Sequence, residues 1–330
     1  LDAPRRRPRR ARGRTAVPPS ERRRRARRGA AWYVLLGLDL RISTWNCFGM
    51  GQGFDALTHQ RAPFGHRLRD AGVISTCSSV DVLCVQEILS RDAQQFFDGL
   101  GPEPFVSRFR DDNRVRLGDG SVRGTGLGIG ARSRLTKRLI LNFPGERVGW
   151  DRLARKGALY VEVDLGGSRA LDLVTVHLQA GYDPAAARVR ASQLAYLRRL
   201  IDEIGSTRER PFVVCGDFNV DGLESSRRLP EYEVLSAALE GFVDLGAEED
   251  LPTYHPHPEG NALAHAFEPN AREQRIDYIF VRPSTKTDVR CKSLTRILDR
   301  PLEETTFADG KPGWASDHYG LSATLEVDAG

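Results

Sequence analysis

The sequence lacks a cysteine framework, a membrane-spanning run and a nucleotide-binding loop. Its five cysteines are an odd number without metal-type spacing, so neither a disulfide framework nor a thiolate metal cage is expected, and a reducing compartment is favoured. Cys47, Cys84 and Cys215 fall in or beside apolar runs, and we expect them in the core. No apolar run is long enough to cross a membrane. Gly124–Gly130 is glycine-rich, but no Lys-Ser or Lys-Thr pair follows it, so it is interpreted as a strand.

Charge is distributed unevenly along the 330 residues. The net charge is +5, but residues 1–28 contribute +11, from 13 arginines against Asp2 and Glu21, so the remainder sums to −6. We expect residues 1–38 to be a disordered basic tail, which either contacts anionic lipid or nucleic acid or is a translated upstream stretch without a role. The rest is expected to be one monomeric domain. A cytoplasmic protein, in contact with membranes at most at their surface, is favoured over a secreted one.

Hydrophobic patterning predicts helices and strands that alternate early in the chain and strands that are denser later. Apolar runs predict strands at residues 40–46, 81–87, 124–130, 157–165, 171–180, 211–215, 274–281, 289–294 and 321–327. Amphipathic stretches predict helices at residues 64–79, 90–100, 184–204 and 231–240. Residues 108–117 are charged and expected to be exposed. No internal repeat or linker interrupts this pattern, which favours a sandwich of antiparallel or mixed sheets flanked by helices.

The stretch from Pro211 to Asp221 carries the most informative pattern of the sequence. A short β-branched run stops at Gly216, and Asp217 and Asn219 follow with one residue between them. On an extended backbone two such residues point to the same side, so a carboxylate and a carboxamide would be presented together. Such a pair can bind a hard cation or a phosphate oxygen. An ordinary Asx-type turn explains the same residues locally.

Further polar side chains occur at the ends of predicted strands or, for one of them, within a strand. They are Asn46, Glu87, His177, Asp277, Asp317 and His318. Singly, each has an ordinary explanation as a turn residue or a satisfied core residue. Together they offer oxygen ligands, which suit Mg²⁺, Mn²⁺ or Ca²⁺, and histidines beside carboxylates, which suit a general base. No nucleophilic Ser or Cys beside a base is evident, so the set favours hydrolysis of a phosphodiester by activated water.

Six segments in order resemble the endonuclease/exonuclease/phosphatase superfamily. They are TWNCFG, VQE, VHLQA, GDFN, RIDYIF and SDH, and they extend from about Leu40 to Val327. The resemblance implies an α/β (α+β) fold, the deoxyribonuclease-like four-layered α/β/β/α sandwich, in which two mostly antiparallel sheets pack between helices. It also implies that residues 39–330 are a catalytic domain that hydrolyses phosphoric diesters with Mg²⁺, or with Mn²⁺ in its place.

The resemblance gives roles to the residues that match the metal site and the base. Glu87 matches the main Mg²⁺ ligand, with Asn46 beside it and Asp317 near the metal. His318 matches the general base, and Asp277 matches the residue that orients it. These five positions are therefore expected to meet in one metal-dependent site.

The remaining matched residues are expected to act on the phosphate and the water. His177 and Asn219 match groups that hold the scissile phosphate, and Asp217 matches a residue that orients the attacking water or assists the leaving group. The segment GWDRLARKG resembles the Asp-x4-Lys-Gly segment of the neutral sphingomyelinase branch, in which Asp151 and Lys156 would position active-site residues.

Three functions remain open from the sequence. The first is a phospholipase-C-like hydrolysis of sphingomyelin or a related phosphocholine lipid at a membrane or micelle surface, which the mildly acidic body favours. The second is a Mg²⁺-dependent nuclease of the same superfamily, with the arginine tail supplying affinity for nucleic acid. The third is a catalytically silent membrane-bound scaffold, against which stands the presence of every expected catalytic residue type.

Overall fold

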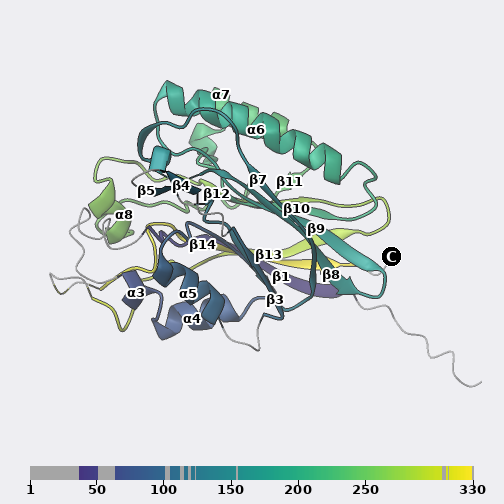
Figure 1. The fold of residues 1–330 in the computed structure, drawn as a ribbon, viewed down its shortest axis with the longest axis horizontal. Coiled ribbons are helices and arrows are strands. Elements are labelled where there is room, and N and C mark those ends of the chain that lie inside the picture. The colour runs from purple at the N-terminus through teal and green to yellow at the C-terminus, as the bar shows by residue number, and fades with distance from the viewer. Residues whose placement is uncertain are drawn as a thin grey trace, which may run out of the picture. The chain divides into compact units, whose positions relative to one another are not determined.

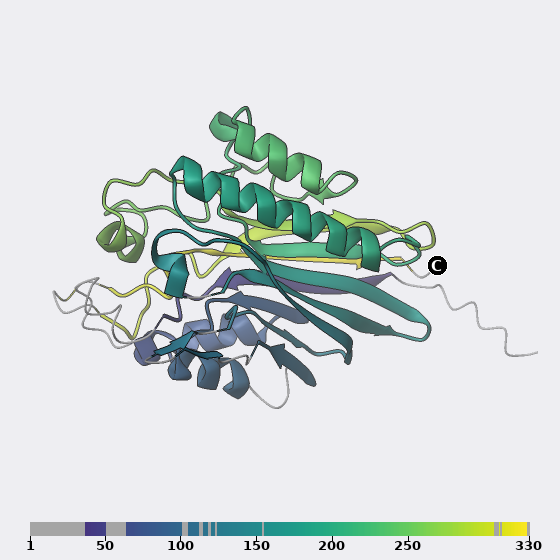
Figure 2. The same cartoon turned by 45° about the horizontal axis from the view of Figure 1, so that its top comes forward.

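The computed structural model describes residues 37–328 except 51–63, 101–104, 112–114, 118–119, 123, 154, 307–309 and 311. All described residues belong to one compact unit, Gly37–Gly330. The predicted basic tail, residues 1–38, therefore lies almost wholly outside the described residues. Two six-stranded sheets pack face to face, with helices on both outer faces (Figures 1 and 2). This arrangement confirms the predicted four-layered α/β/β/α sandwich.

The first sheet contains the two ends of the described chain. In spatial order its strands are β13 (Val289–Ile297), β14 (Gly320–Val327), β1 (Leu38–Asn46), β2 (Val82–Gln86), β6 (Gly128–Ala131) and β3 (Ser107–Arg110). Only β1 and β2 are parallel; the other neighbours are antiparallel. Asn46 therefore lies beside Gln86 at the carboxyl ends of the two parallel strands.

The second sheet repeats this design with one parallel pair at its centre. Its order is β11 (Val243–Asp244), β12 (Asp277–Arg282), β10 (Phe212–Asp217), β9 (Arg169–His177), β8 (Gly157–Gly166) and β7 (Leu135–Asn142). β9 and β10 are parallel, and the other pairs are antiparallel. Asp217 consequently pairs with His177 on one side and with Asp277 on the other.

The main core lies between the two sheets. It is built from every second residue of the strands, because successive side chains of a strand point to opposite faces of its sheet. In β10, Val213 and Cys215 point into this core, whereas Phe212 and Val214 point to the outer helices. Both faces of β10 are therefore apolar, which explains its continuous hydrophobic sequence. Each such buried side chain contributes about 1.5–3 kcal/mol relative to an exposed one. Cys47, Cys84 and Cys215 are all buried, as expected.

Helices cover the outer face of each sheet. α6 (Pro184–Ile204) and α7 (Pro230–Ala238) cover the second sheet, while α4 (Ala71–Ser78) and α5 (Arg91–Gly99) cover the first (Figure 1). The shorter elements are α3 (Phe64–Arg67), α8 (Ala262–Phe267), β4 (Val115–Leu117), β5 (Gly120–Val122) and the 3₁₀ turns Gly149–Leu153 and Glu224–Ser226. None of the helices in the described part combines the length and apolarity needed to span a membrane.

Three local predictions differ from the structure. The single helix expected over residues 64–79 is two helices, because Asp70 accepts a hydrogen bond from Gly72 and starts α4 anew. Residues 108–117, expected to be exposed, contribute to β3, whose side chains are half-buried, and include β4. Asp277, expected within a strand, is the first residue of β12. Strand β7 and helix α8 were not predicted.

Candidate active site

Four strands end at one place, two from each sheet. The side chains at or directly after these ends are Asn46, Glu87, His177 and Asp217. The amide of Asn46 donates to Asp217 Oδ2 across the two sheets at 3.0 Å. In each sheet the two parallel strands have their carboxyl ends side by side. Because the two sheets pack face to face, the carboxyl ends of all four strands lie close together. The structure thus brings together residues that the sequence singled out separately.

Gly216 allows the close approach of β9 and β10 beside this site. Its φ is +133°, a conformation that residues with a Cβ rarely adopt, and a Cβ there would collide with the carbonyl oxygen of Val176. The next pair along the two strands is Asp217 and His177. The glycine at this point of the sequence is therefore required for the pairing of the two functional side chains.

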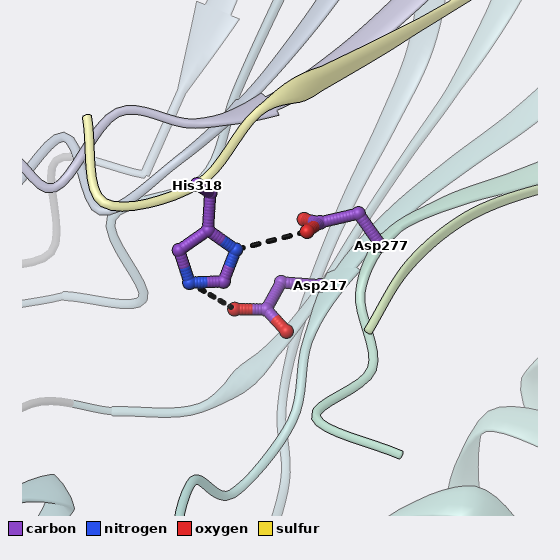
Figure 3. Close-up of side chains that lie close together, drawn as sticks. All are labelled: Asp217, Asp277 and His318. Carbon is purple, nitrogen blue, oxygen red and sulfur yellow. Dashed lines mark hydrogen bonds and ion pairs between the residues drawn. The ribbon is translucent and has the colours of Figure 1, made fainter. Parts of the chain in front are cut away.

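His318 lies between two carboxylates (Figure 3). Its Nδ1 is 2.9 Å from Asp277 Oδ2, and its Nε2 is 3.9 Å from Asp217 Oδ2. The backbone N–H of Asp277 donates to Thr253 Oγ1 at 3.1 Å, which holds Asp277 in place beside His318. With Nδ1 donating to Asp277, Nε2 is the nitrogen that faces the site and can accept a proton.

The carboxylates around His318 favour its charged form. Burial acts to lower the pKa of His318, but the charges of Asp277 and Asp317, with the hydrogen bond to Asp277, outweigh burial and raise the pKa well above its usual value. Burial also raises the pKa of Asp217 to about 6. In the protein without a cation, the site therefore keeps a proton on His318 that a positive charge nearby would help to release.

His177 is bound by a buried lysine. Lys156 Nζ is 2.6 Å from His177 Nε2 and 3.0 Å from Asp151 Oδ1. A lysine ammonium only donates, so His177 accepts through Nε2 and is neutral, in agreement with a pKa that burial, Lys156 and His318 lower well below its usual value. Asp151 also accepts from the backbone N–H of Ala180 at 2.6 Å. Asp151 and Lys156 thus form a chain of contacts that ends on an active-site histidine.

Asn219 reaches the site by a different backbone route from the one expected. Its φ is +52°, so the extended geometry that would align it with Asp217 does not continue past the strand. Asp217 Oδ1 instead accepts the backbone N–H of Asn219 at 2.9 Å, and the Asn219 amide donates to the carbonyl of Leu178 at 3.0 Å. The Asx-type turn is therefore present, and it directs Asn219 into the pocket, while the role of Asn219 stays a prediction.

Glu87 is the residue that best fits a bound cation. Its φ is +62°, and its Oε2 is buried without a hydrogen-bond partner among the described residues. Its Oε1 is 3.9 Å from His177 Nε2. Burial raises the pKa of Glu87 to about 7, with a smaller contribution in the same direction from Asp317. An unpartnered buried carboxylate is costly, and an oxygen-ligated divalent cation would satisfy it.

A second set of possible ligand atoms overlaps with the base. Within the described part of the chain, Asp217, Asp277 and His318 form a buried group whose ligand atoms lie within 4.8 Å of one another. Asp317, whose pKa burial raises, is held by Ser316 Oγ at 3.1 Å. The site can therefore hold a metal, while the ligand set expected from the sequence, Glu87 with Asn46 and Asp317, stays a prediction.

A family model decides the relationship of this chain. The model described as the Endonuclease/Exonuclease/phosphatase family matches residues 43–318. The chain belongs to this family. A search of curated protein sequences returned no match.

Solved structures of the same fold include a toxin, a sphingomyelinase and TDP2. Beta toxin from Staphylococcus aureus with bound magnesium ions is 16% identical, with a TM-score of 0.69 over 87% of this chain and 99% of that one. Sphingomyelinase C from Streptomyces griseocarneus is 16% identical, with a TM-score of 0.65 and the same coverage of 87% and 99%. D. rerio TDP2 with a single-strand DNA product is 20% identical, with a TM-score of 0.63, again over 87% and 99%. At these identities the likeness shows the fold.

The family fold places the site in a pocket of about 330 Å³. Eight of the predicted residues line it: Asn46, Glu87, Asp151, His177, Asp217, Asn219, Asp317 and His318. Asp277 and Lys156 lie directly behind, in contact with the two histidines. Sequence reasoning missed Tyr254, Phe267 and Glu268 on the pocket wall. They come from a part of the chain without regular hydrophobic periodicity, so no local pattern indicated them.

Proposed function

We propose that this protein is a metal-dependent phosphodiesterase that hydrolyses sphingomyelin or a related phosphocholine lipid to phosphocholine and a ceramide-type product. The charge of the pocket carries the proposal. Six acidic residues line it, and no lysine or arginine does so among the described residues. The six are Glu87, Asp151, Asp183, Asp217, Glu268 and Asp317. The negative charge of such a pocket attracts a positive headgroup. The neighbouring phosphodiester can bind there when a metal cation offsets the charge of the phosphate.

The residues of the pocket supply the proton transfer. His318 Nε2 accepts a proton from the attacking water while the water oxygen bonds to phosphorus. The bond from phosphorus to the lipid oxygen breaks, and this oxygen takes up a proton from the imidazolium or from solvent and leaves as the alcohol. Asp277 keeps the imidazole in the required orientation through its 2.9 Å contact with Nδ1. Asn219, Asp217 and His177 line the same pocket, where they can contact the phosphate, the water and the leaving oxygen.

Glu87, with Asn46 and Asp317 nearby, would hold Mg²⁺ or Mn²⁺. The bound ion would supply positive charge for the phosphate oxygens as negative charge develops on them. The unpartnered Oε2 of Glu87 supports this assignment. The bound magnesium described for beta toxin is in agreement with it.

Nuclease activity is the alternative, and TDP2 with its DNA product has the same fold. A nuclease contacts several phosphates through Lys and Arg, which makes its affinity fall steeply with salt. The described lining of this pocket has carboxylates where such cations would be needed. Repulsion of a polyanion therefore favours the zwitterionic lipid over DNA or RNA.

The test compares two substrates and two variants. Purified protein would be assayed for release of phosphocholine from sphingomyelin in mixed micelles and for cleavage of single- and double-stranded DNA, each with Mg²⁺ or chelator. We expect Mg²⁺-dependent release of phosphocholine, lost in His318→Ala and kept in His66→Ala, an exposed histidine elsewhere in the fold. Cleavage of DNA without any hydrolysis of sphingomyelin or lysophospholipid would refute the lipid substrate.

A further inference from the structure

One wall of the pocket combines aromatic rings with a single carboxylate. The hydroxyls of Tyr182 and Tyr254 both donate to Glu268 Oε2, at 2.8 and 3.0 Å. Phe267 lies next to this carboxylate in the chain and lines the same pocket, where its ring packs edge-on against Phe48 with centroids 5.5 Å apart. None of these residues has a part in the proton transfer described above.

The hydrogen bonds hold one carboxylate beside the aromatic side chains of this wall. Both phenols bind the same oxygen, and Glu268 Oε1 receives no hydrogen bond from the described residues. Burial raises the pKa of Tyr254, so this phenol stays a neutral donor at physiological pH. The faces of aromatic rings attract cations, and quaternary ammonium groups are recognised by such rings because they have no N–H to donate.

Tyr254 connects this wall to the general base. Its ring lies 5.3 Å from the imidazole of His318, centroid to centroid, and its hydroxyl reaches Glu268. Phosphocholine has a phosphate at one end and a trimethylammonium group at the other, joined by two carbons. A phosphate placed for attack beside His318 would therefore direct the ammonium group along Tyr254 toward Glu268.

We propose that Tyr182, Tyr254, Phe267 and Glu268 form the subsite that binds the quaternary ammonium of a choline headgroup. The inference rests on the proposed function, since it names the group recognised in the same pocket. It assigns headgroup selection to α8, the loop before it and the turn before α6, away from the strand-end residues proposed to act on the phosphate. A primary ammonium is a poorer ligand, because three N–H donors would face ring faces and one carboxylate.

The test replaces only the charge of the headgroup. The substrates are p-nitrophenyl phosphocholine and its 3,3-dimethylbutyl analogue, in which carbon replaces the nitrogen and removes the positive charge. We expect the wild type to prefer the choline ester by about tenfold in kcat/KM. Glu268→Gln should weaken this preference, of which the aromatic rings keep a part, while Glu273→Gln, at a carboxylate paired with His255 outside this pocket, should keep it in full.

A second pair of variants separates the ring from the hydroxyl. Tyr182 is 61% exposed, so its replacement is compatible with folding. Tyr182→Leu should weaken the preference for the choline ester, and Tyr182→Phe, which keeps the ring face, should restore most of it. Wild type that hydrolyses both esters equally, or Glu268→Gln that prefers the choline ester as strongly as the wild type, would overturn the subsite.

Binding distinguishes the subsite from the proposed activity. Calorimetry would compare phosphocholine with 3,3-dimethylbutyl phosphate in the presence of Mg²⁺, without turnover. The protein could bind phosphocholine more tightly in a way that depends on Glu268 and yet hydrolyse neither ester. That result would refute the proposed function and support the subsite. Equal binding of the two compounds would refute the subsite whether or not the protein is active.

Discussion

Replacing Glu87 with glutamine should stabilise the metal-free protein above neutral pH while it removes activity. The Oε2 atom of Glu87 is buried and has no partner among the described residues. Ionising this carboxyl therefore places in the protein a charge that Lys156 and His318 offset only in part, unless a cation is bound. Glutamine keeps the shape of the side chain and removes its charge. The variant therefore lacks the free-energy cost of the buried carboxylate, and it also lacks the proposed metal ligand.

The magnitude follows from the pKa of Glu87, which burial raises from 4.5 to about 7. Below pH 4.5 both the folded and the unfolded states are protonated, and the group has no effect. Between pH 4.5 and about pH 7 the folded state holds more protons than the unfolded state, so the free energy of unfolding falls as the pH rises. The full loss of stability is present above pH 7. The loss corresponds to about 3 kcal/mol. Allowing for the desolvation of the new amide, we expect a gain of about 1–3 kcal/mol.

Urea unfolding in chelator at pH 5 and pH 8 measures this effect. Glu87→Gln should exceed the wild type in free energy of unfolding at pH 8 and match it closely at pH 5. Glu240→Gln, at an exposed position, serves as the matched control and should change neither value. Excess Mg²⁺ should stabilise the wild type alone, by mass action. A variant no more stable than the wild type at pH 8 in chelator would refute the reasoning.

Two further substitutions test the base and the scaffold separately. Asp277→Asn removes a charge that raises the pKa of His318, so that pKa, followed by NMR of the imidazole, should fall and kcat should drop; an unchanged titration would contradict the orienting pair. Arg275→Met breaks a buried ion pair with Asp244 of 2.7 Å and should lower the free energy of unfolding by about 3–5 kcal/mol without changing kcat in the folded protein. Arg198→Met, at a more exposed pair, should cost less than about 1 kcal/mol in the same urea titration, and equal losses would contradict this reasoning.

Much of the site was predictable because strand ends are local features. The apolar runs before His177 and Asp217 identify buried strands, and a polar residue directly after such a run marks an edge of the sheet. The helix over residues 184–204 was predicted with its bounds because Asp183 caps it and Pro184 opens it. The four layers came from the resemblance of the motifs and agree with the observed sheets.

The wall of the pocket could not be predicted in the same way. Glu268 accepts hydrogen bonds from two tyrosines that lie 86 and 14 residues away from it, and no periodic pattern links such positions. The edge strand β7 escaped prediction because its exposed and half-buried side chains lack a clear alternation. The start of β12 at Asp277 is set by its pairing with Asp217, a long-range contact that the sequence around Asp277 does not specify.

The pairing of β1 with β14 has a consequence for the folding of this protein. Leu38 lies opposite Val327, so the first described strand obtains its neighbour on that side only from the last one. Ser316 Oγ also donates to the carbonyl of Asn46, across 270 residues. Contacts of such separation form late in folding. The active site therefore requires the pairing of β1 with β14, and recovery of activity during refolding should follow the formation of this long-range pairing.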